Sequence, residues 1–166
     1  MTTVNTEAGY VLAPEEGQTI QFLETLMTVK AGAKETGNAF TLLEWTAPVG
    51  FAPPPHTHHS EDEAFYIFEG TMTVTCGDKS WEATPGSFVF LPRGVIHGFR
   101  VTSATPLRGL QLTVPAGFEQ FIAEAGEPLP LSTASAASGP DIAKLLAAAA
   151  RHNIEIHVSP EAPEGQ

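Results

Sequence analysis

The chain has 166 residues and a mass of 17.6 kDa, which is enough for one compact domain and too little for two of ordinary size. Hydrophobic residues make up 42% and charged residues 16% of the sequence, a balance that excludes a disordered chain. The net charge is −11 and the 8 basic residues are scattered along the chain, so nucleic acid is not an expected partner.

The first residues and the hydropathy of the chain bear on its location. The first ten residues contain no basic segment followed by an apolar one, so we expect no export signal. No run approaches the roughly 18 apolar residues of a membrane span, so we expect no membrane contact and a cytoplasmic protein. The single cysteine, Cys76, is expected to face the core as a reduced thiol.

Residues 20–115 have the pattern of a β-sandwich or barrel, because Gly and Pro divide them into short apolar runs. Runs with a period of two residues predict strands at 40–44, 63–68, 72–76, 88–91, 95–101 and 110–114. The pairs Glu69-Gly70 and Gly77-Asp78 are expected to be two-residue hairpin turns. Residues 1–115 are therefore expected to form one β-barrel with its N-terminal strands.

The composition changes after residue 115, and residues 116–158 are expected to form a helical extension that packs on the barrel. The first helix is indicated by the spacing of Phe118, Phe121, Ile122 and Ala125, with its end at Gly126. Residues 129–138 have the composition of a loop. The tail at 159–166 is expected to be flexible.

A second helix is predicted after this loop. Ser138 or Gly139 is the expected cap, with Pro140 in the first turn. The expected apolar stripe consists of Ile142, Leu145, Leu146 and Ala149. Asn153 is expected to end the helix in a left-handed conformation.

Three of the 6 histidines lie within four positions, as His56, His58 and His59. Residues i and i+2 of a strand point to the same side, so His56 and His58 can bind one metal while His59 points away. If a bend at 60–62 reverses the parity, Glu63 turns inward as well. His97 lies on the same side of its predicted strand as a set of apolar residues that is expected to face the core. Three imidazoles and one carboxylate suit a divalent transition metal.

The same residues carry a resemblance to a known family. Gly50, His56, His58, Glu63 and Gly70 match the pattern G-x5-H-x-H-x4-E-x6-G of the first cupin motif. The second motif, G-x5-P-x-G-x2-H, is matched by Gly86, Pro92, Gly94 and His97. The resemblance implies an all-β fold, the cupin jelly-roll β-barrel, with His56, His58, Glu63 and His97 as metal ligands. One position departs from the family pattern, since Val101 stands where an asparagine often closes the second motif.

The remaining polar and aromatic residues near these motifs have simpler interpretations. His59, His152 and His157 are expected to be hydrogen-bonded residues outside the site. Glu61 and Asp62 are expected to lie in a solvated acidic turn, and either replaces Glu63 only if the bend lies elsewhere. The aromatic residues expected in the core are Phe51, Phe65, Phe88, Phe90 and Phe99, some of which could line a substrate pocket.

The cupin fold supports many reactions, so the resemblance alone does not define the activity. Residues 63–66 and 117–121 resemble small single-domain cupins of the quercetin dioxygenase type. This resemblance implies oxidative ring opening of a small flavonol-like or enolic substrate, with Glu63 as both metal ligand and catalytic base. The implied cofactor is one divalent transition metal (Fe, Ni, Mn, Co or Zn), and the implied assembly is a homodimer. The alternatives are a metallo-cupin that binds or senses a small molecule without turnover and a metal-dependent isomerase.

Overall fold

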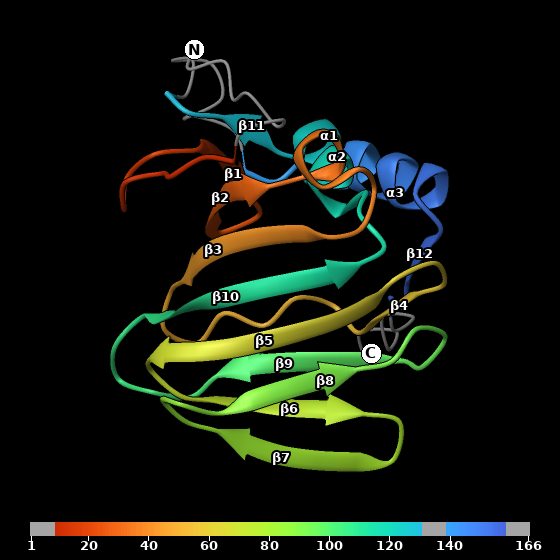
Figure 1. Ribbon diagram of the computed structural model, residues 1–166. Helices are drawn as coiled ribbons and strands as arrows, with labels where there is room; N and C mark the ends of the chain where they lie inside the picture. Colours follow the sequence, from red (N-terminus) through yellow and green to blue (C-terminus); the bar gives the residue numbers. More distant parts are fainter. Residues whose placement is uncertain (1–8, 131–138, 159–166) are drawn as a thin grey trace.

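The computed structural model describes residues 9–130 and 139–158. Within these residues the chain forms two antiparallel sheets that face each other, with three helices gathered at one end (Figure 1). The seven-stranded sheet contains, in spatial order, β11 (Glu127–Pro128), β1 (Gln18–Phe22), β2 (Thr25–Ala31), β3 (Thr41–Ala47), β10 (Leu107–Val114), β5 (Asp62–Glu69) and β8 (Phe88–Leu91). The five-stranded sheet contains β12 (Ile154–Ile156), β4 (His56–His58), β9 (His97–Val101), β6 (Met72–Cys76) and β7 (Lys79–Ala83).

The hydrophobic core fills the space between the two sheets. Along β3, buried and half-buried residues alternate strictly, as the period of two requires. Trp45 of β3 is 1% exposed, and its ring centroid lies 5.3 Å from those of both Phe65 and Phe99. These two rings belong to opposite sheets, so Trp45 joins the two layers. The predicted all-β jelly-roll barrel with a short C-terminal helical extension is confirmed.

The two predicted hairpin turns have different outcomes. The turn at 77–78 joins the neighbouring antiparallel strands β6 and β7, as expected. The turn at 69–70 does not form a hairpin, because β5 and β6 belong to different sheets. Gly70 has a φ of 79° and a Cβ there would lie 2.8 Å from Cα of Leu107, so this glycine allows the chain to cross tightly between the sheets.

The predicted core position of two phenylalanines is wrong. Phe88 and Phe90 are 68% and 56% exposed, whereas Leu91 is 1% exposed. All four residues of β8 are apolar, so the sequence does not reveal which alternate set faces inward. Val89 and Leu91 take the inner face, and the two phenylalanines lie on the outer face beside the half-exposed Tyr66, which pairs with Phe88. Cys76, expected in the core, is only partly buried at its margin.

The helices are α1 (Ala33–Thr36), which the sequence did not predict, α2 (Phe118–Ala125) and α3 (Ile142–Arg151). Helix α2 agrees with the prediction and ends at Gly126, with Phe118, Phe121 and Ile122 buried. Among the described residues, no helix has both the length and the apolar composition that crossing a bilayer requires. The predicted loop at 131–138 and tail at 159–166 lie outside the described residues.

Helix α3 differs from its prediction in two details. Its N-cap is Asp141, whose side chain accepts a hydrogen bond from the backbone N–H of Lys144, rather than the expected Ser138 or Gly139. The expected stripe is also shifted: Leu145 and Ala149 are buried together with Ala148, whereas Ile142 and Leu146 are exposed. Asn153 has a φ of 54° after the helix, as expected, and β12 follows at once.

Candidate metal centre

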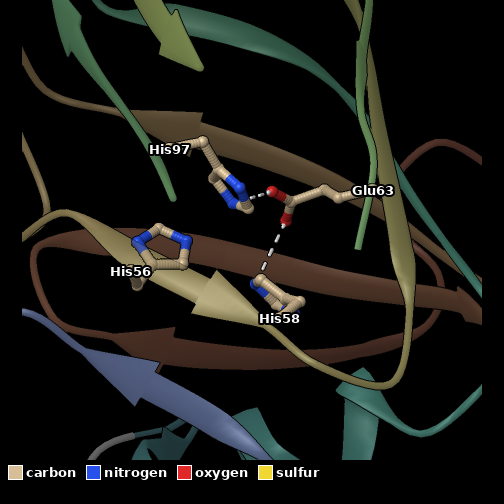
Figure 2. Close-up of side chains that lie close together, drawn as sticks. All are labelled: His56, His58, Glu63 and His97. Atoms are coloured by element: carbon tan, nitrogen blue, oxygen red, sulfur yellow. Dashed lines mark ion pairs between the residues drawn. The ribbon is translucent and has the colours of Figure 1, made fainter. Parts of the chain in front are cut away.

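The four predicted ligand residues lie together at one end of the barrel interior. His56 and His58 come from β4, Glu63 from β5 and His97 from β9. Each offers one ligand atom, and these atoms all lie within 4.8 Å of one another (Figure 2). A bend at 59–61 carries the chain from β4 in one sheet to β5 in the other. Glu63 therefore faces the histidines, as the sequence predicted.

Strand pairing explains why these side chains meet. His56 pairs with His97 across β4 and β9, which places their side chains on the same face of the five-stranded sheet. The ring centroids of these two residues are 4.6 Å apart. On the facing sheet, Glu63 is 2% exposed and shares the inner side of β5 with Phe65 and Ile67. The site is thus part of the barrel interior.

Backbone carbonyls determine which nitrogen of two rings faces the site. Nδ1 of His56 lies 2.9 Å from the carbonyl oxygen of Pro54, and Nδ1 of His97 lies 3.0 Å from that of Val95. A carbonyl can only accept, so Nδ1 carries the proton in both rings and Nε2 keeps its lone pair. Nε2 of His97 is buried without a hydrogen-bond partner, 3.2 Å from Oε2 of Glu63.

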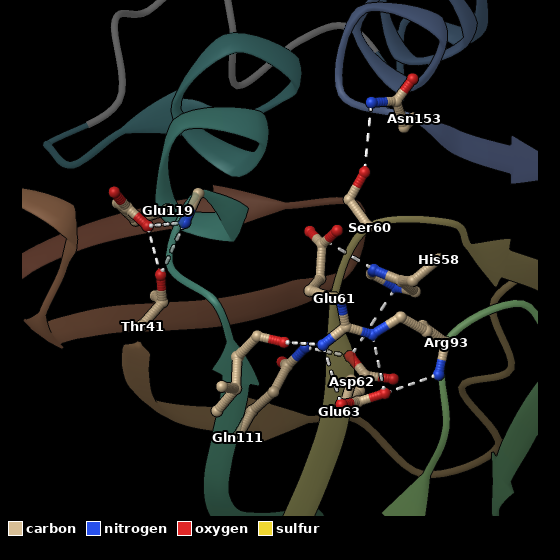
Figure 3. Close-up of polar contacts among 12 residues, drawn as sticks. Thr41, His58, Ser60, Glu61, Asp62, Glu63, Arg93, Gln111, Glu119 and Asn153 are labelled. Carbon is tan, nitrogen blue, oxygen red and sulfur yellow. Dashed lines mark hydrogen bonds and ion pairs between the residues drawn. The ribbon is translucent and has the colours of Figure 1, made fainter. Parts of the chain in front are cut away.

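His58 faces a carboxylate instead of a carbonyl, at ion-pair distance and not at hydrogen-bond distance. Oε1 of Glu61 lies 3.6 Å from Nδ1 of His58, and Nε2 of His58 lies 3.9 Å from Oε1 of Glu63 (Figure 3). Glu61 is only 6% exposed, so its expected place in a solvated turn is wrong. The bend after β4 folds Glu61 back over His58, where its carboxylate orients the ring.

Gln111 of β10 belongs to the site, and the sequence analysis missed it. Its side chain is buried, and Nε2 donates a hydrogen bond of 2.5 Å to Oε1 of Glu63. The contact joins neighbouring strands of the seven-stranded sheet (Figure 3). The sequence did contain an indication of this role, because Gln111 is a polar residue at an inward position of β10. Gln111 holds Oε1, which lies 3.9 Å from Nε2 of His58, while Oε2 lies 3.2 Å from Nε2 of His97.

The protonation states prepare the site for a cation. Burial, aided by the neighbouring histidines, lowers the pKa of His56 to about 4 in spite of Glu63. For the Glu63 carboxyl, burial has the opposite effect and raises the pKa. The three neighbouring histidines outweigh burial, however, and lower the pKa of Glu63 to about 2. The pKa of His58 is raised, because the carboxylates of Glu63 and Glu61 outweigh its burial. At neutral pH, Glu63 is therefore ionised and His56 is neutral.

These residues fit a divalent transition metal. Nε2 of His97 faces the cluster and is a buried polar atom without a hydrogen-bond partner, which is costly unless a further ligand satisfies it. Imidazole nitrogens with one carboxylate suit Fe, Ni, Mn, Co and Zn alike. The cluster therefore suits a metal ion whose identity is unresolved.

The other histidines and acidic residues of the region lie outside this cluster. Nε2 of His59 lies 2.9 Å from Oε2 of Glu155 at the surface. Nε2 of His152 lies 2.8 Å from Glu124, and Nε2 of His157 lies 2.9 Å from Thr57. Asp62 forms a two-pronged ion pair with Arg93. Val101 is 2% exposed and belongs to the core.

Comparison with known proteins agrees with this fold and this site. Residues 43–114 match the family model described as the cupin domain, a region that contains all four clustered residues. Residues 43–114 form a cupin domain. This family assignment confirms the resemblance on which the ligand set was predicted.

The relatives of this chain in sequence include a named dioxygenase. Quercetin 2,3-dioxygenase of Bacillus subtilis is 31% identical over 120 residues, which are 72% of this chain and 35% of that protein. The chain spans between 35% and 60% of the lengths of the curated relatives it matches.

Solved structures support the fold alone, since their sequence identities are low. A predicted oxalate decarboxylase from Thermotoga maritima has a TM-score of 0.58 at 19% identity and covers 64% of this chain and 99% of that chain. KdgF from Halomonas sp. has a TM-score of 0.57 at 16% identity and covers 68% of this chain and 99% of that chain.

An apolar pocket lies against the metal-facing histidines of the cupin domain. His56 and His58 line it, and every other lining residue is Phe, Leu, Ile or Pro. The barrel contributes the turn between β1 and β2 and the prolines at 53–54. The C-terminal segment contributes Phe118 and Phe121 of α2, Leu145 of α3, and Ile154 and Ile156 of β12. The helices and β12 therefore form one wall of the pocket.

Proposed function

We propose that the protein is a metal-dependent dioxygenase that acts on a small enolic substrate. The observation that carries this proposal is the Glu63 carboxylate, which is buried, ionised and placed among three histidines beside an apolar pocket. The 31% identity to a quercetin 2,3-dioxygenase over 72% of this chain supports the same reaction class.

The residues of the cluster take separate roles in this proposal. His56, His58 and His97 would hold the metal through Nε2. A bound divalent metal would supply Lewis acidity that favours the deprotonated form of an enol. Because Gln111 donates to Oε1 of Glu63, Oε2 is the oxygen that would contact the metal with one lone pair and accept the enol proton with the other. Glu63 is therefore both a metal ligand and the catalytic base.

The apolar pocket would hold the body of the substrate with its enol at the cluster. A substrate held in this way has its enol oriented toward Glu63 before the reaction begins, which lowers the entropic part of the barrier. In the proposed reaction, the enol and O₂ are the two substrates, and both oxygen atoms enter the products. No external reductant is needed.

The test is oxygen consumption by metal-reconstituted protein with a panel of enols that includes flavonols and one-ring hydroxyketones. We expect oxygen uptake equal to substrate loss, and both atoms of labelled O₂ in the products. Turnover that continues without oxygen and leaves the substrate mass unchanged would identify an isomerase. Tight enol binding without turnover, with each of several metals, would identify a binding or sensing protein.

Two variants assign the role of the base. Glu63→Gln keeps the shape of the side chain but cannot accept a proton, so we expect its turnover to fall by about 100-fold or more. His152→Ala removes a histidine whose ring pairs with Glu124 outside the cluster, so its turnover should equal that of the unaltered chain. Equal losses in the two variants would contradict the assignment.

A further inference from the structure

The pocket beside the metal cluster offers a ligand almost no polar contact. Apart from His56 and His58, its lining consists of Phe, Leu, Ile and Pro side chains. Among the described residues, no lysine or arginine lines it. A ligand held there would meet hydrogen-bonding groups only at the cluster, so the rest of its surface must be apolar to be desolvated without penalty.

The cations nearest in sequence to the pocket wall are already paired. Lys144 precedes the lining residue Leu145 on α3, but its Nζ donates to the carbonyl oxygen of Gly126 and to Oε1 of Glu127, at 3.0 and 2.8 Å. Arg151, at the end of α3, is bound to Glu124. A carboxylate or phosphate on the substrate would thus find no free cation on this wall.

The wall contacts the cluster directly. The ring centroid of Phe118 lies 5.5 Å from that of His58, and Ile154 and Ile156 of β12 pair with His58 and His56 of β4. A substrate body against these residues therefore has its reactive end at the histidines.

Size adds a second restriction. The cavity has a volume of about 50 Å³, well below the roughly 300 Å³ at the lower end of ordinary ligand pockets. Leu145, which is 5% exposed, closes the pocket from α3. The pocket is partly open to solvent, so a one-ring molecule can lie partly inside it, whereas a three-ring molecule must leave most of its surface outside or displace the C-terminal wall.

We infer that the pocket selects a compact, uncharged, apolar enol and rejects enols that carry a carboxylate or phosphate, with Ile156 and Leu145 as specificity-determining residues. This inference rests on the proposed function, since it concerns the substrate of the same site.

The experiment measures binding, not turnover. Zinc-loaded protein is titrated without oxygen, by calorimetry, with maltol and with comenic acid, one-ring hydroxypyranones of which only the second carries a carboxylate. We expect maltol to bind about tenfold more tightly or better, because the carboxylate has no partner on the wall. Equal affinity, or a preference for comenic acid, would overturn the inference.

A charge placed in the wall should reverse the preference. Ile156 is half-buried, so Ile156→Lys can keep its stem against the wall and offer an ammonium to the carboxylate. We expect this variant to shift the affinity ratio about tenfold or more toward comenic acid. Leu146→Lys adds the same charge at an exposed position of α3 outside the pocket, and should leave the ratio unchanged. An unchanged ratio in Ile156→Lys, or the same shift in both variants, would contradict the inference.

The size restriction has its own variant. Leu145→Ala should raise the affinity for the three-ring 3-hydroxyflavone relative to maltol by about tenfold, whereas Leu146→Ala should not. These titrations are independent of the dioxygenase assay. A chain that shows the preference but consumes no oxygen refutes the proposed activity alone, and one that consumes oxygen with carboxylated enols refutes the selectivity alone.

Discussion

The hydrogen bond from Gln111 to Glu63 provides the most direct test of how the site is built. Gln111→Leu keeps a side chain of similar length on β10 but removes the donor 2.5 Å from Oε1 of Glu63. The carboxylate then stays buried and ionised with one oxygen unsatisfied, and it is free to rotate away from the histidines. We expect losses in both stability and metal affinity.

Both losses can be estimated from the contact. A hydrogen bond to a charged group contributes about 1.5–3 kcal/mol. In a chain of this length, about 1 kcal/mol corresponds to roughly 2–4 °C in Tm, so the metal-free variant should melt roughly 3–12 °C lower. Loss of a residue that orients a metal ligand weakens metal binding by about 10–100-fold. This corresponds to about 1.4–2.7 kcal/mol.

The assay combines thermal unfolding of metal-free protein with a cobalt titration followed by visible absorption, which reports the geometry around the ion. Thr113→Val is the matched control, because Thr113 lies two residues further on β10, is 1% exposed and has a buried hydroxyl without a partner. The control should bind cobalt like the unaltered chain, with the same spectrum. Gln111→Leu protein with unchanged cobalt affinity and spectrum would refute the positioning role, even if its Tm fell.

Two further predictions concern the histidines. His97→Ala should remove most of the bound metal found by elemental analysis after reconstitution, and His152→Ala should remove none; equal losses would mean that the wrong histidines were assigned. Metal binding should also weaken as the pH falls, because the raised pKa of His58 lets a proton compete with the metal, whereas His56, with a pKa of about 4, stays neutral above pH 5. Below the pKa of His58, the Kd should rise by about tenfold or more per pH unit, and a Kd that does not change with pH in a titration by calorimetry would contradict the competition.

The sequence predicted the cluster from the local geometry of each strand together with the resemblance to the two cupin motifs. On a strand, spacing by two places His56 and His58 on one face. The apolar alternation around Glu63 and His97 also indicated which side of each strand faces the core. An open step was the change of parity between His58 and Glu63, and the bend at 59–61 supplies it.

The features that the sequence did not predict depend on contacts between distant segments. Gln111 acquires its role only through the pairing of β10 with β5, which joins residues 48 positions apart. Glu61 is buried because the bend after β4 turns its side chain toward His58, and the sequence does not show the direction of that bend. The strand β12 has three residues, too few to show a period of two. The turn at 69–70 has the composition of a hairpin, and only the assignment of β5 and β6 to different sheets distinguishes it from one.

The C-terminal segment contacts both the histidines of the cluster and the apolar pocket beside them. Strand β4 has three register pairs with β12 but only one with β9, so β12 is the main backbone support of His56 and His58. Asn153 adds a hydrogen bond of 3.1 Å from its side chain to Ser60 in the bend (Figure 3). The same segment supplies the apolar wall of the pocket. A change that displaces β12 must therefore alter the alignment of two metal-facing histidines together with the shape of the pocket, whereas Glu63 and Gln111, held by the seven-stranded sheet, should stay in place.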